Sequence, residues 1–263
     1  MGSATTQALA ASIETLAAAN GVTLDTAREL FAAARAVSES SQLSGALADP
    51  SAPVEARRNV VAAVFGAFSE DAKSVLKTAV AERWSNADQL VDGIEELAIR
   101  AASIAEPDAD IEGEIFGFSR VIAANAELEL ALGTRLGGED AKVTLVERLL
   151  ADGATSAPAK LIVSSLVRQP RGRRIRQLLN RAMRIVSAQH GRVVATVHTA
   201  TPLNEAQRTR LSDALSRRYD GRVSLNVVID PAVVGGLRVQ IADDVIDGSI
   251  SARLADLRQK LAG

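Results

Sequence analysis

Apolar residues recur every three or four positions along most of the chain, and every second position along parts of its last third. The first spacing is typical of helices that bury one face, and the second is typical of strands that bury one face. We therefore predict a mainly α protein in which N-terminal amphipathic helical bundles, with a duplicated pattern, precede a small C-terminal α/β module. The predicted domains are a six-helix bundle at 1–106, a second helical unit at 107–190 and the α/β module at 191–263.

The first predicted domain has six helices joined by short polar links. Thr23 and Ser69 stand where helix N-caps are expected, and Asn86 with Gln89 forms a near capping box. Helices of this length are marginal alone, so each is expected to add an apolar stripe to a shared core. The predicted helices run over 4–19, 23–37, 41–48, 54–65, 72–83 and 87–105.

The acidic, proline-containing segment 106–110 ends this bundle, and beyond it the helical pattern recurs at a constant offset of 85 positions. Self-similarity at a fixed period favours duplication of a helical unit over a chance match of two amphipathic patterns. Two further helices are expected near 158–167 and 174–189. The recurring residues are Glu29, Leu30, Phe31 and Arg35 with Glu114, Ile115, Phe116 and Arg120; Leu43 and Leu47 with Leu128 and Leu132; and Val60, Val61, Val64 and Phe65 with Leu145, Val146, Leu149 and Leu150.

The last third of the chain mixes period-two and helical patterns. A helix is expected to begin at the near capping box of Asn204 and Gln207. The acidic pair at 243–244 is expected to turn the chain into a short last strand, because Asp tolerates left-handed conformations and bonds its own backbone. The longer predicted strands run over 192–199, 223–229 and 237–241.

The run from Asp230 to Ser249, DPAVVGGLRVQIADDVIDGS, holds the most specific pattern in the chain. Gly235 and Gly236 precede a strand, which predicts positive φ angles, a bulge, or a backbone approach too close for a Cβ. The Asp-Gly-Ser at 247–249 ends the strands and offers caps for a last helix. Apolar residues of that helix fall on one face: Ile250, Leu254, Leu257 and Leu261.

This long, gapless run resembles the C-terminal signature of the delta-subunit family of F-type ATP synthases, to which the mitochondrial oligomycin-sensitivity-conferring protein belongs. The strand, turn and helix from 192 to 219 are similar to the same family in the same order. Our hypothesis is that the signature residues support the backbone of the last module and do not contact partners themselves. These residues are Asp230, Pro231, Gly235, Gly236, Asp247, Gly248 and Ser249.

The resemblance implies a non-catalytic stator subunit of the proton-translocating ATP synthase. Such a subunit links the alpha/beta catalytic head to the b subunits of the peripheral stalk, so that the head resists rotor torque. The resemblance further implies that a helical domain receives N-terminal helices of the alpha subunits and that the C-terminal region receives the b subunits. The family's usual chain has one helical domain, whereas this sequence carries about one more, and which copy meets the alpha subunits is left open.

A possible partner-binding face is predicted at two places, the apolar stripe of Ile250, Leu254 and Leu257 and the basic residues Arg173 and Arg174. The arginine density of 168–184 would also suit phosphates, so the alternative function is a helical adaptor that binds nucleic acid through this tract. No aromatic residue lies within the tract to stack on bases, which favours an acidic protein partner instead. The tract contains Arg168, Arg171, Arg173, Arg174, Arg176, Arg181 and Arg184.

Composition excludes several kinds of site. The chain has no Cys, hence no disulfide or thiolate metal site, and its only histidines are His190 and His198. No Gly-Lys-Ser/Thr occurs, and the acidic residues at 243–247 lack the spacing of a calcium loop. We therefore predict no catalytic residue, no cofactor and no metal site, and we do not expect an enzyme.

Charge and hydropathy bear on the partners and the location. Residues 1–160 carry 13 Lys and Arg against 24 Asp and Glu, while 161–263 carry 17 against 8, which suggests two kinds of partner. The longest apolar run, 60–68, is too short to span a bilayer, and no signal-peptide pattern is present. Together with the resemblance, this predicts a peripheral location at the cytoplasmic face of the plasma membrane, membrane contact only through the complex, and no nucleic-acid partner.

Overall fold

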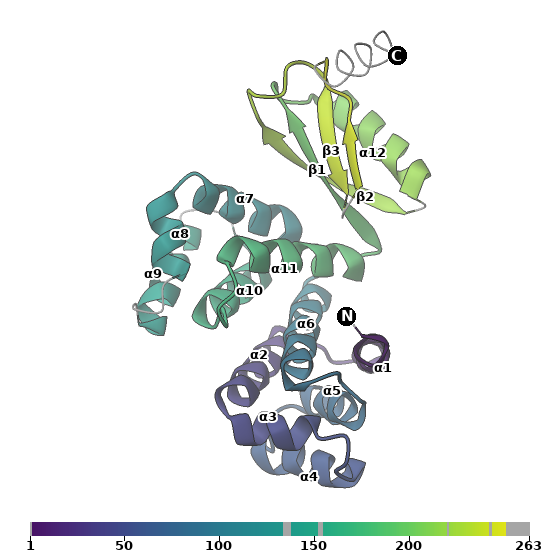
Figure 1. The fold of residues 1–263 in the computed structure, drawn as a ribbon, viewed down its shortest axis with the longest axis vertical. Helices are drawn as coiled ribbons and strands as arrows, with labels where there is room; N and C mark the ends of the chain where they lie inside the picture. The colour runs from purple at the N-terminus through teal and green to yellow at the C-terminus, as the bar shows by residue number, and fades with distance from the viewer. Residues whose placement is uncertain (1, 134–137, 152–154, 220, 242–243, 251–263) are drawn as a thin grey trace, which may run out of the picture. The chain divides into compact units, whose positions relative to one another are not determined.

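The computed structural model describes residues 2–133, 138–151, 155–219, 221–241 and 244–250. The chain divides into two compact units, Met1–Val186 and Ser187–Gly263. The first is helical and the second contains a four-stranded mixed sheet, so the predicted mainly α fold with a C-terminal α/β module is confirmed (Figure 1). Among the described residues, no helix is both long and apolar enough to cross a membrane.

The helices that precede the sheet follow one another with short links, and the first six correspond to the six predicted ones. They are α1 (Ser3–Ala18), α2 (Leu24–Glu39), α3 (Ser41–Ala48), α4 (Val54–Val64), α5 (Glu70–Ala81), α6 (Ala87–Ala105), α7 (Ile111–Ala123), α8 (Ala126–Gly133), α9 (Glu139–Ala151), α10 (Ala157–Arg168) and α11 (Ile175–Gln189).

Side-chain caps begin several of these helices where the sequence predicts them. Thr23, Ser69 and Asn86 each accept a hydrogen bond from the backbone N–H three residues further on. Each bond satisfies a donor that the first helical turn leaves without an intrahelical partner, and such a cap is worth about 1 kcal/mol. Local sequence therefore determines where these helices start.

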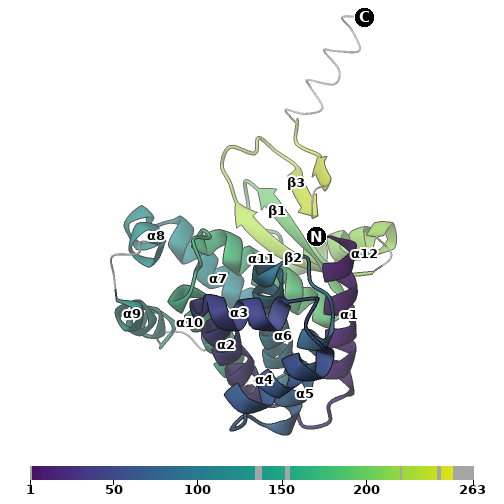
Figure 2. The ribbon, with the colours of Figure 1, turned by 60° about the horizontal axis from the view of Figure 1, so that its bottom comes forward.

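α6 runs through the middle of the first unit (Figures 1 and 2). It contacts α1, α2, α3 and α5, which precede it in the chain, and α10, which follows it. α6 is amphipathic: its apolar face is buried against these neighbours, and Asp92, Glu95 and Glu96 follow one another on its polar face. Its large buried apolar residues are Leu90, Val91, Ile94, Leu97 and Ile99.

The helices after α6 repeat the order of those before it. α8 starts 85 positions after α3, and α9 starts 85 positions after α4. Positions 85 apart are also fully buried in pairs: Leu30 and Ile115, Leu47 and Leu132, and Val61 and Val146. One continuous apolar core runs through both sets of helices, and it does not stop at the predicted domain boundary at 106–107. Two separate helical domains therefore stay a prediction.

The sheet of the second unit has the strand order β2-β1-β3-β4 (Figure 1). β1 and β2 are parallel, and α12 connects them, because parallel neighbours need a crossover. β3 pairs antiparallel with both β1 and β4. The elements are β1 (Arg192–Thr199), α12 (Glu205–Tyr219), β2 (Arg222–Ile229), β3 (Leu237–Ile241) and β4 (Asp244–Asp247).

α12 covers one face of this sheet (Figure 1). Ala195 and Val197 of β1 and Val239 and Ile241 of β3 are buried with Leu215 of α12 in a separate apolar core. The capping box of Asn204 and Gln207 is present, since each backbone N–H donates to the other residue's side chain at 2.9 Å. The predicted alternation of the strands is therefore confirmed.

The end of the chain differs slightly from the prediction. β4 begins at Asp244, one residue earlier than expected. Asp243 and the predicted last helix beyond Ile250, with Leu254, Leu257 and Leu261, lie outside the described residues.

Candidate functional site

The family-signature residues gather where β3 begins and β4 ends. The N–H of Gly248 donates to the carbonyl of Leu237 at 2.9 Å. The N–H of Ile250 donates to the carbonyls of Val234 and Gly235, at 3.3 and 3.2 Å. These bonds tie the segment 234–237 to the segment 247–250, and we call the two segments the glycine junction.

The backbone of the glycine junction requires both of its first two glycines. Gly235 has φ 64° and Gly236 has φ 80°, in the left-handed region that costs other residues roughly 1–2 kcal/mol. A Cβ on Gly236 would overlap the carbonyl oxygen of Gly248, and a Cβ on Gly235 would overlap the side chain of Ile250. Two predicted alternatives, positive φ and a close backbone approach, are therefore both confirmed.

Asp230 and Asp247 shape the turns beside the junction. The N–H of Asp230 donates to the carbonyl of Thr199, the last residue of β1, at 2.8 Å. Asp230 Oδ1 accepts the N–H of Ala232 at 3.0 Å, and Pro231 between them is exposed. Asp247 Oδ1 accepts the N–H of Ser249 at 3.0 Å. Hydrogen bonds from the hydroxyl and then the backbone of Ser249 hold the pKa of Asp247 below its ordinary value. These signature residues thus make the turns and are bonded to backbone.

Two apolar side chains are exposed at the glycine junction. Val234 is 62% exposed and Ile250 is 51% exposed, and a backbone hydrogen bond holds the two residues side by side. Exposed neighbours of this kind suit a binding surface better than scattered single residues do. Ile250 is thus accessible, as the predicted partner-binding role requires, whereas Leu254 and Leu257 lie outside the described residues.

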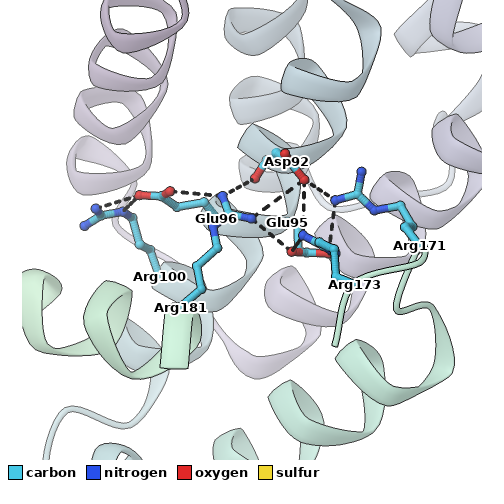
Figure 3. A network of polar contacts seen from close by, with 7 residues as sticks. All are labelled: Asp92, Glu95, Glu96, Arg100, Arg171, Arg173 and Arg181. Carbon is cyan, nitrogen blue, oxygen red and sulfur yellow. Dashed lines mark hydrogen bonds and ion pairs between the residues drawn. The ribbon is translucent and has the colours of Figure 1, made fainter. Parts of the chain in front are cut away.

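Three of the seven arginines of the basic tract pair with acidic side chains of α6. Figure 3 shows arginines from α11 and the preceding turn converging on these carboxylates, with one more arginine supplied by α6 itself. The network comprises Asp92, Glu95, Glu96, Arg100, Arg171, Arg173 and Arg181.

Glu95 is the centre of the network. Arg173 grips it with both guanidinium ends, Nη1 to Oε1 at 3.0 Å and Nη2 to Oε2 at 2.7 Å. Arg181 bonds Glu95 Oε1 at 3.2 Å and Glu96 Oε2 at 3.4 Å, while Arg100 bonds Glu96 at 2.9 Å. Glu95 and Glu96 are buried, and buried carboxylates are tolerated only when paired in this way.

A tight turn aims two of these arginines. The N–H of Arg173 donates to the carbonyl of Pro170 at 2.9 Å, and the two residues between them have positive φ, 49° at Arg171 and 75° at Gly172. These angles belong to a type I′ turn, in which a non-glycine residue is strained. Arg171 is held in this conformation while its guanidinium pairs with Asp92. Arg171 therefore combines a strained backbone conformation with an ion pair to Asp92.

The rest of the tract divides between ion pairs and solvent. Arg168 pairs with Asp140 at 3.2 Å, and Arg176 pairs with Glu129 at 2.9 Å. Arg174 is exposed. Of the two predicted partner-binding arginines, Arg173 is thus committed to Glu95 and Arg174 faces outward. The sequence favoured an acidic protein partner for this tract, but most of its arginines pair with carboxylates of the same chain. Less positive charge is therefore available to bind phosphates.

No catalytic arrangement is evident in the described residues. An open cleft of about 650 Å³ lies beside the turn, lined by arginines 168–174 with Glu129, Glu139 and Lys142. Within the described ranges, no group of His, Asp or Glu could hold a metal ion. The imidazole of His198 lies 3.7 Å from Asp230, at the end of a strand, with its Nδ1 toward the carboxylate.

Sequence analysis missed the acidic half of the network. Asp92, Glu95 and Glu96 were expected only as polar positions of an amphipathic helix. They lie three and four residues apart on one face of α6, which is the ordinary pattern of a solvent-exposed polar face. No local signal shows that Glu95 and Glu96 are buried and need cationic partners from elsewhere in the chain.

The fold and these sites define the class of the protein: a mainly helical chain that ends in a small mixed-sheet module, whose most specific residues build backbone turns. The family model described as ATP synthase delta (OSCP) subunit matches residues 98–261. The chain belongs to this family, and thus to the subunits of ATP synthase. The match begins inside α6, so it covers α7 to α11 and the sheet module.

Relatives extend the similarity to the whole chain. An ATP synthase subunit delta from Leifsonia xyli subsp. xyli is 48% identical over 265 residues and is matched over 100% of both chains. One from Streptomyces avermitilis is 37% identical over 241 residues, covering 90% of this chain and 88% of the relative. In a solved Toxoplasma gondii mitochondrial ATP synthase, one chain aligns with a TM-score of 0.37 and 17% identity, over 64% of this chain and 97% of that chain.

Proposed function

We propose that this chain is a non-catalytic stator subunit that links the alpha/beta head of ATP synthase to the b subunits of its peripheral stalk. The observation that carries the proposal is the use of the family signature: its glycines and aspartates close the glycine junction and leave Val234 and Ile250 exposed beside it. Such a rigid module with an apolar rim is suited to holding a partner helix under load.

The proposed partners follow the two ends of the chain. The helical part would receive N-terminal helices of the alpha subunits, and the C-terminal module would receive the b subunits through Ile250, Leu254 and Leu257. Arg174 is exposed and remains a proposed contact, while Arg173 would act by holding the turn that presents it. The proposed location is the cytoplasmic face of the plasma membrane, with the membrane reached only through the complex.

We propose further that the helical part arose by duplication. The recurring helix order, the paired burial at an offset of 85 and the recurring Glu-to-Ser contact of α2–α5 and α7–α10 support this. α1 and α6 are also related by this offset, and both pack against the fifth helix of their own set, α5 and α10. α6 would therefore belong to both sets, as the last helix of one and the first of the other.

Binding of the purified full-length chain to a delta-free catalytic head tests the stator role. We expect association at one chain per head at moderate salt, and only weak dependence on ionic strength, because apolar helix docking is not a phosphate contact. If a folded chain did not bind the head, the stator role would be contradicted and only the similarity of sequence and fold would remain. Flat nucleotide hydrolysis by the isolated chain is expected in the same preparation.

Binding of a b-subunit fragment tests the other end. Leu254→Asp should weaken it in a chain that still folds, whereas Val245→Asp, on the exposed strand β4, should not. Equal affinities of the two variants for the b-subunit fragment would show that Leu254 is not part of the interface. The outcome of the head-binding experiment would not be affected.

A further inference from the structure

The link between α1 and α2 holds the only Asn-Gly pair in the sequence, Asn20 and Gly21. Both residues are exposed and lie outside the helices. Asparagine is a chemically labile residue, and it is most labile before glycine, whose backbone nitrogen is not shielded by a Cβ from the preceding side chain. The sequence therefore marks this link as a place where the chain itself can react.

Reaction at the link requires a backbone nitrogen that is free to move. α1 ends with a hydrogen bond from the N–H of Ala19 to the carbonyl of Leu16 at 3.3 Å. Across the described part of the chain, neither the N–H of Gly21 nor the side-chain amide of Asn20 has a hydrogen-bond partner. No hydrogen bond therefore has to break before the nitrogen of Gly21 approaches the Cγ atom of Asn20.

The surroundings leave room for this approach. Asn20 and Gly21 line an open pocket of about 480 Å³ together with Thr15, Asp71 and Ser74. A Cβ built on Gly21 would lie 2.9 Å from a carboxylate oxygen of Asp71, and among the described residues it would meet no other atom within 4 Å beyond its chain neighbours. The pair is thus open to solvent, and the carboxylate of Asp71 lies beside it.

The remaining six asparagines are protected by the structure. Three of them cap helices, each with its Oδ1 accepting the N–H three residues further on, at 2.9, 3.1 and 2.9 Å: Asn86, Asn125 and Asn204. Asn59 and Asn180 lie inside α4 and α11, where the N–H of the next residue belongs to the helical ladder. Asn226 is buried in β2. All six are followed by residues that carry a Cβ, so Asn20 differs from them in both sequence and structure.

From these observations we propose that Asn20 is a site of spontaneous covalent modification, at which asparagine is converted to isoaspartate and aspartate. The backbone nitrogen of Gly21 forms a bond to Cγ of Asn20 while the bond from Cγ to Nδ2 breaks, and Nδ2 leaves as ammonia with the proton of the Gly21 N–H. A succinimide ring remains. Water then opens this ring at either carbonyl: opening at the main-chain carbonyl of Asn20 gives isoaspartate, and opening at Cγ gives aspartate. The reaction is independent of the proposed stator role.

The product alters the link in two ways. It adds a carboxylate to the pocket that Asp71 also lines, and like charges at close range repel each other. Isoaspartate also routes the main chain through the former side chain, which lengthens the link by a methylene group. α1 packs against α5 and α6, and Thr15 donates a hydrogen bond to Thr78 at 3.2 Å. We therefore expect α1 to be held less firmly after the modification and its amides to exchange faster.

Peptide mapping of the full-length chain by mass spectrometry tests the proposal. After incubation at mildly basic pH in water enriched in heavy oxygen, we expect the Asn20 peptide to lose its amide and to take up labelled oxygen in two separable products. The rate in the folded chain should lie within about fivefold of the rate in a synthetic peptide of residues 14–28, because the link needs no opening. A slower rate in the folded chain, or equally fast conversion of Asn86, would overturn the proposal.

Two variants test the role of the Gly21 nitrogen. Gly21→Ala can keep the backbone conformation because Gly21 has no positive φ, and the far end of Asp71 can move away from the new methyl group. That methyl group shields the nitrogen and should slow the conversion of Asn20 at least about tenfold, whereas Gly45→Ala, at an open position in α3, should leave the rate unchanged. An unchanged thermal transition before incubation checks that each variant is folded. Equal rates in the two variants would show that the nitrogen of Gly21 is not the nucleophile and would overturn the proposal.

Discussion

Glu114 on α7 accepts hydrogen bonds from both the backbone N–H and the hydroxyl of Ser156, at 3.1 and 2.5 Å. Glu29 on α2 accepts the same two bonds from Ser69, at 3.0 and 2.5 Å. In each case the serine is the N-cap of the helix that follows, α10 or α5, and its oxygen accepts the N–H three residues on. A carboxylate on one helix therefore secures the first turn of another, and the same device is built twice.

Removing this carboxylate should cost similar stability in either set. Glu114→Ala and Glu29→Ala each remove two hydrogen bonds to a charged acceptor, and we expect a loss of about 1–3 kcal/mol. Urea unfolding measures the change. Glu114→Gln keeps one acceptor and should lose less, whereas Glu127→Ala on the exposed side of α8 should have little effect. A large loss in one set and none in the other would argue against equivalent roles.

Glu95 should matter more, because it is buried among arginines. Glu95→Ala leaves Arg173 and Arg181 without their main acceptor, and we expect a loss of about 3–5 kcal/mol, as for breaking a buried ion pair. Denaturant titration of the full chain checks this value.

A surface pair supplies the comparison for that experiment. Arg176→Ala breaks an exposed pair with Glu129 and should cost at most about 1 kcal/mol. If the two variants unfolded at the same denaturant concentration, the network around Glu95 would be no more important than a surface contact.

Gly236→Val should destabilise the sheet module. The new side chain must adopt φ near 80° and would meet the carbonyl of Gly248, so a loss of about 2 kcal/mol or more is expected. Hydrogen exchange of the β1 and β3 amides reports this loss separately from the helices. Gly117→Ala, inside α7 with open space around it, should instead gain about 0.5–1 kcal/mol. Normal protection in the Gly236 variant would show that the junction tolerates a side chain.

The pH dependence of the module should include a contribution from Asp247. Its pKa is lowered from the ordinary 3.8 by the hydrogen bonds from Ser249, so the folded state favours the charged form. That stabilisation is complete above the unfolded pKa and disappears as the pH falls through the lowered folded pKa. The melting difference between wild type and Asp247→Asn should therefore be present at pH 6 and shrink below about pH 4. A difference that stays constant with pH would assign the effect to shape rather than charge.

Much of this architecture follows from local sequence. The caps at Thr23, Ser69 and Asn86, and the box of Asn204 with Gln207, were predictable because a capping bond spans only three residues. The positive φ of the paired glycines follows from the same kind of short-range rule. The recurring order of α2–α4 and α7–α9 is visible in the sequence as a constant offset of 85 positions.

The sequence by itself thus determined the helices, the strands and the family, because periodicity, caps and a gapless motif are properties of neighbouring residues. Tertiary structure alone decided what the charges do. Arg173 and Glu95 are separated by 78 positions, and no local rule pairs them. Glu95 and Glu96 are buried because several helices pack against α6. The same packing brings Arg173 and Arg181 close enough to pair with Glu95. The physical reason is that a buried charge must be neutralised by whichever opposite charge the fold brings within reach.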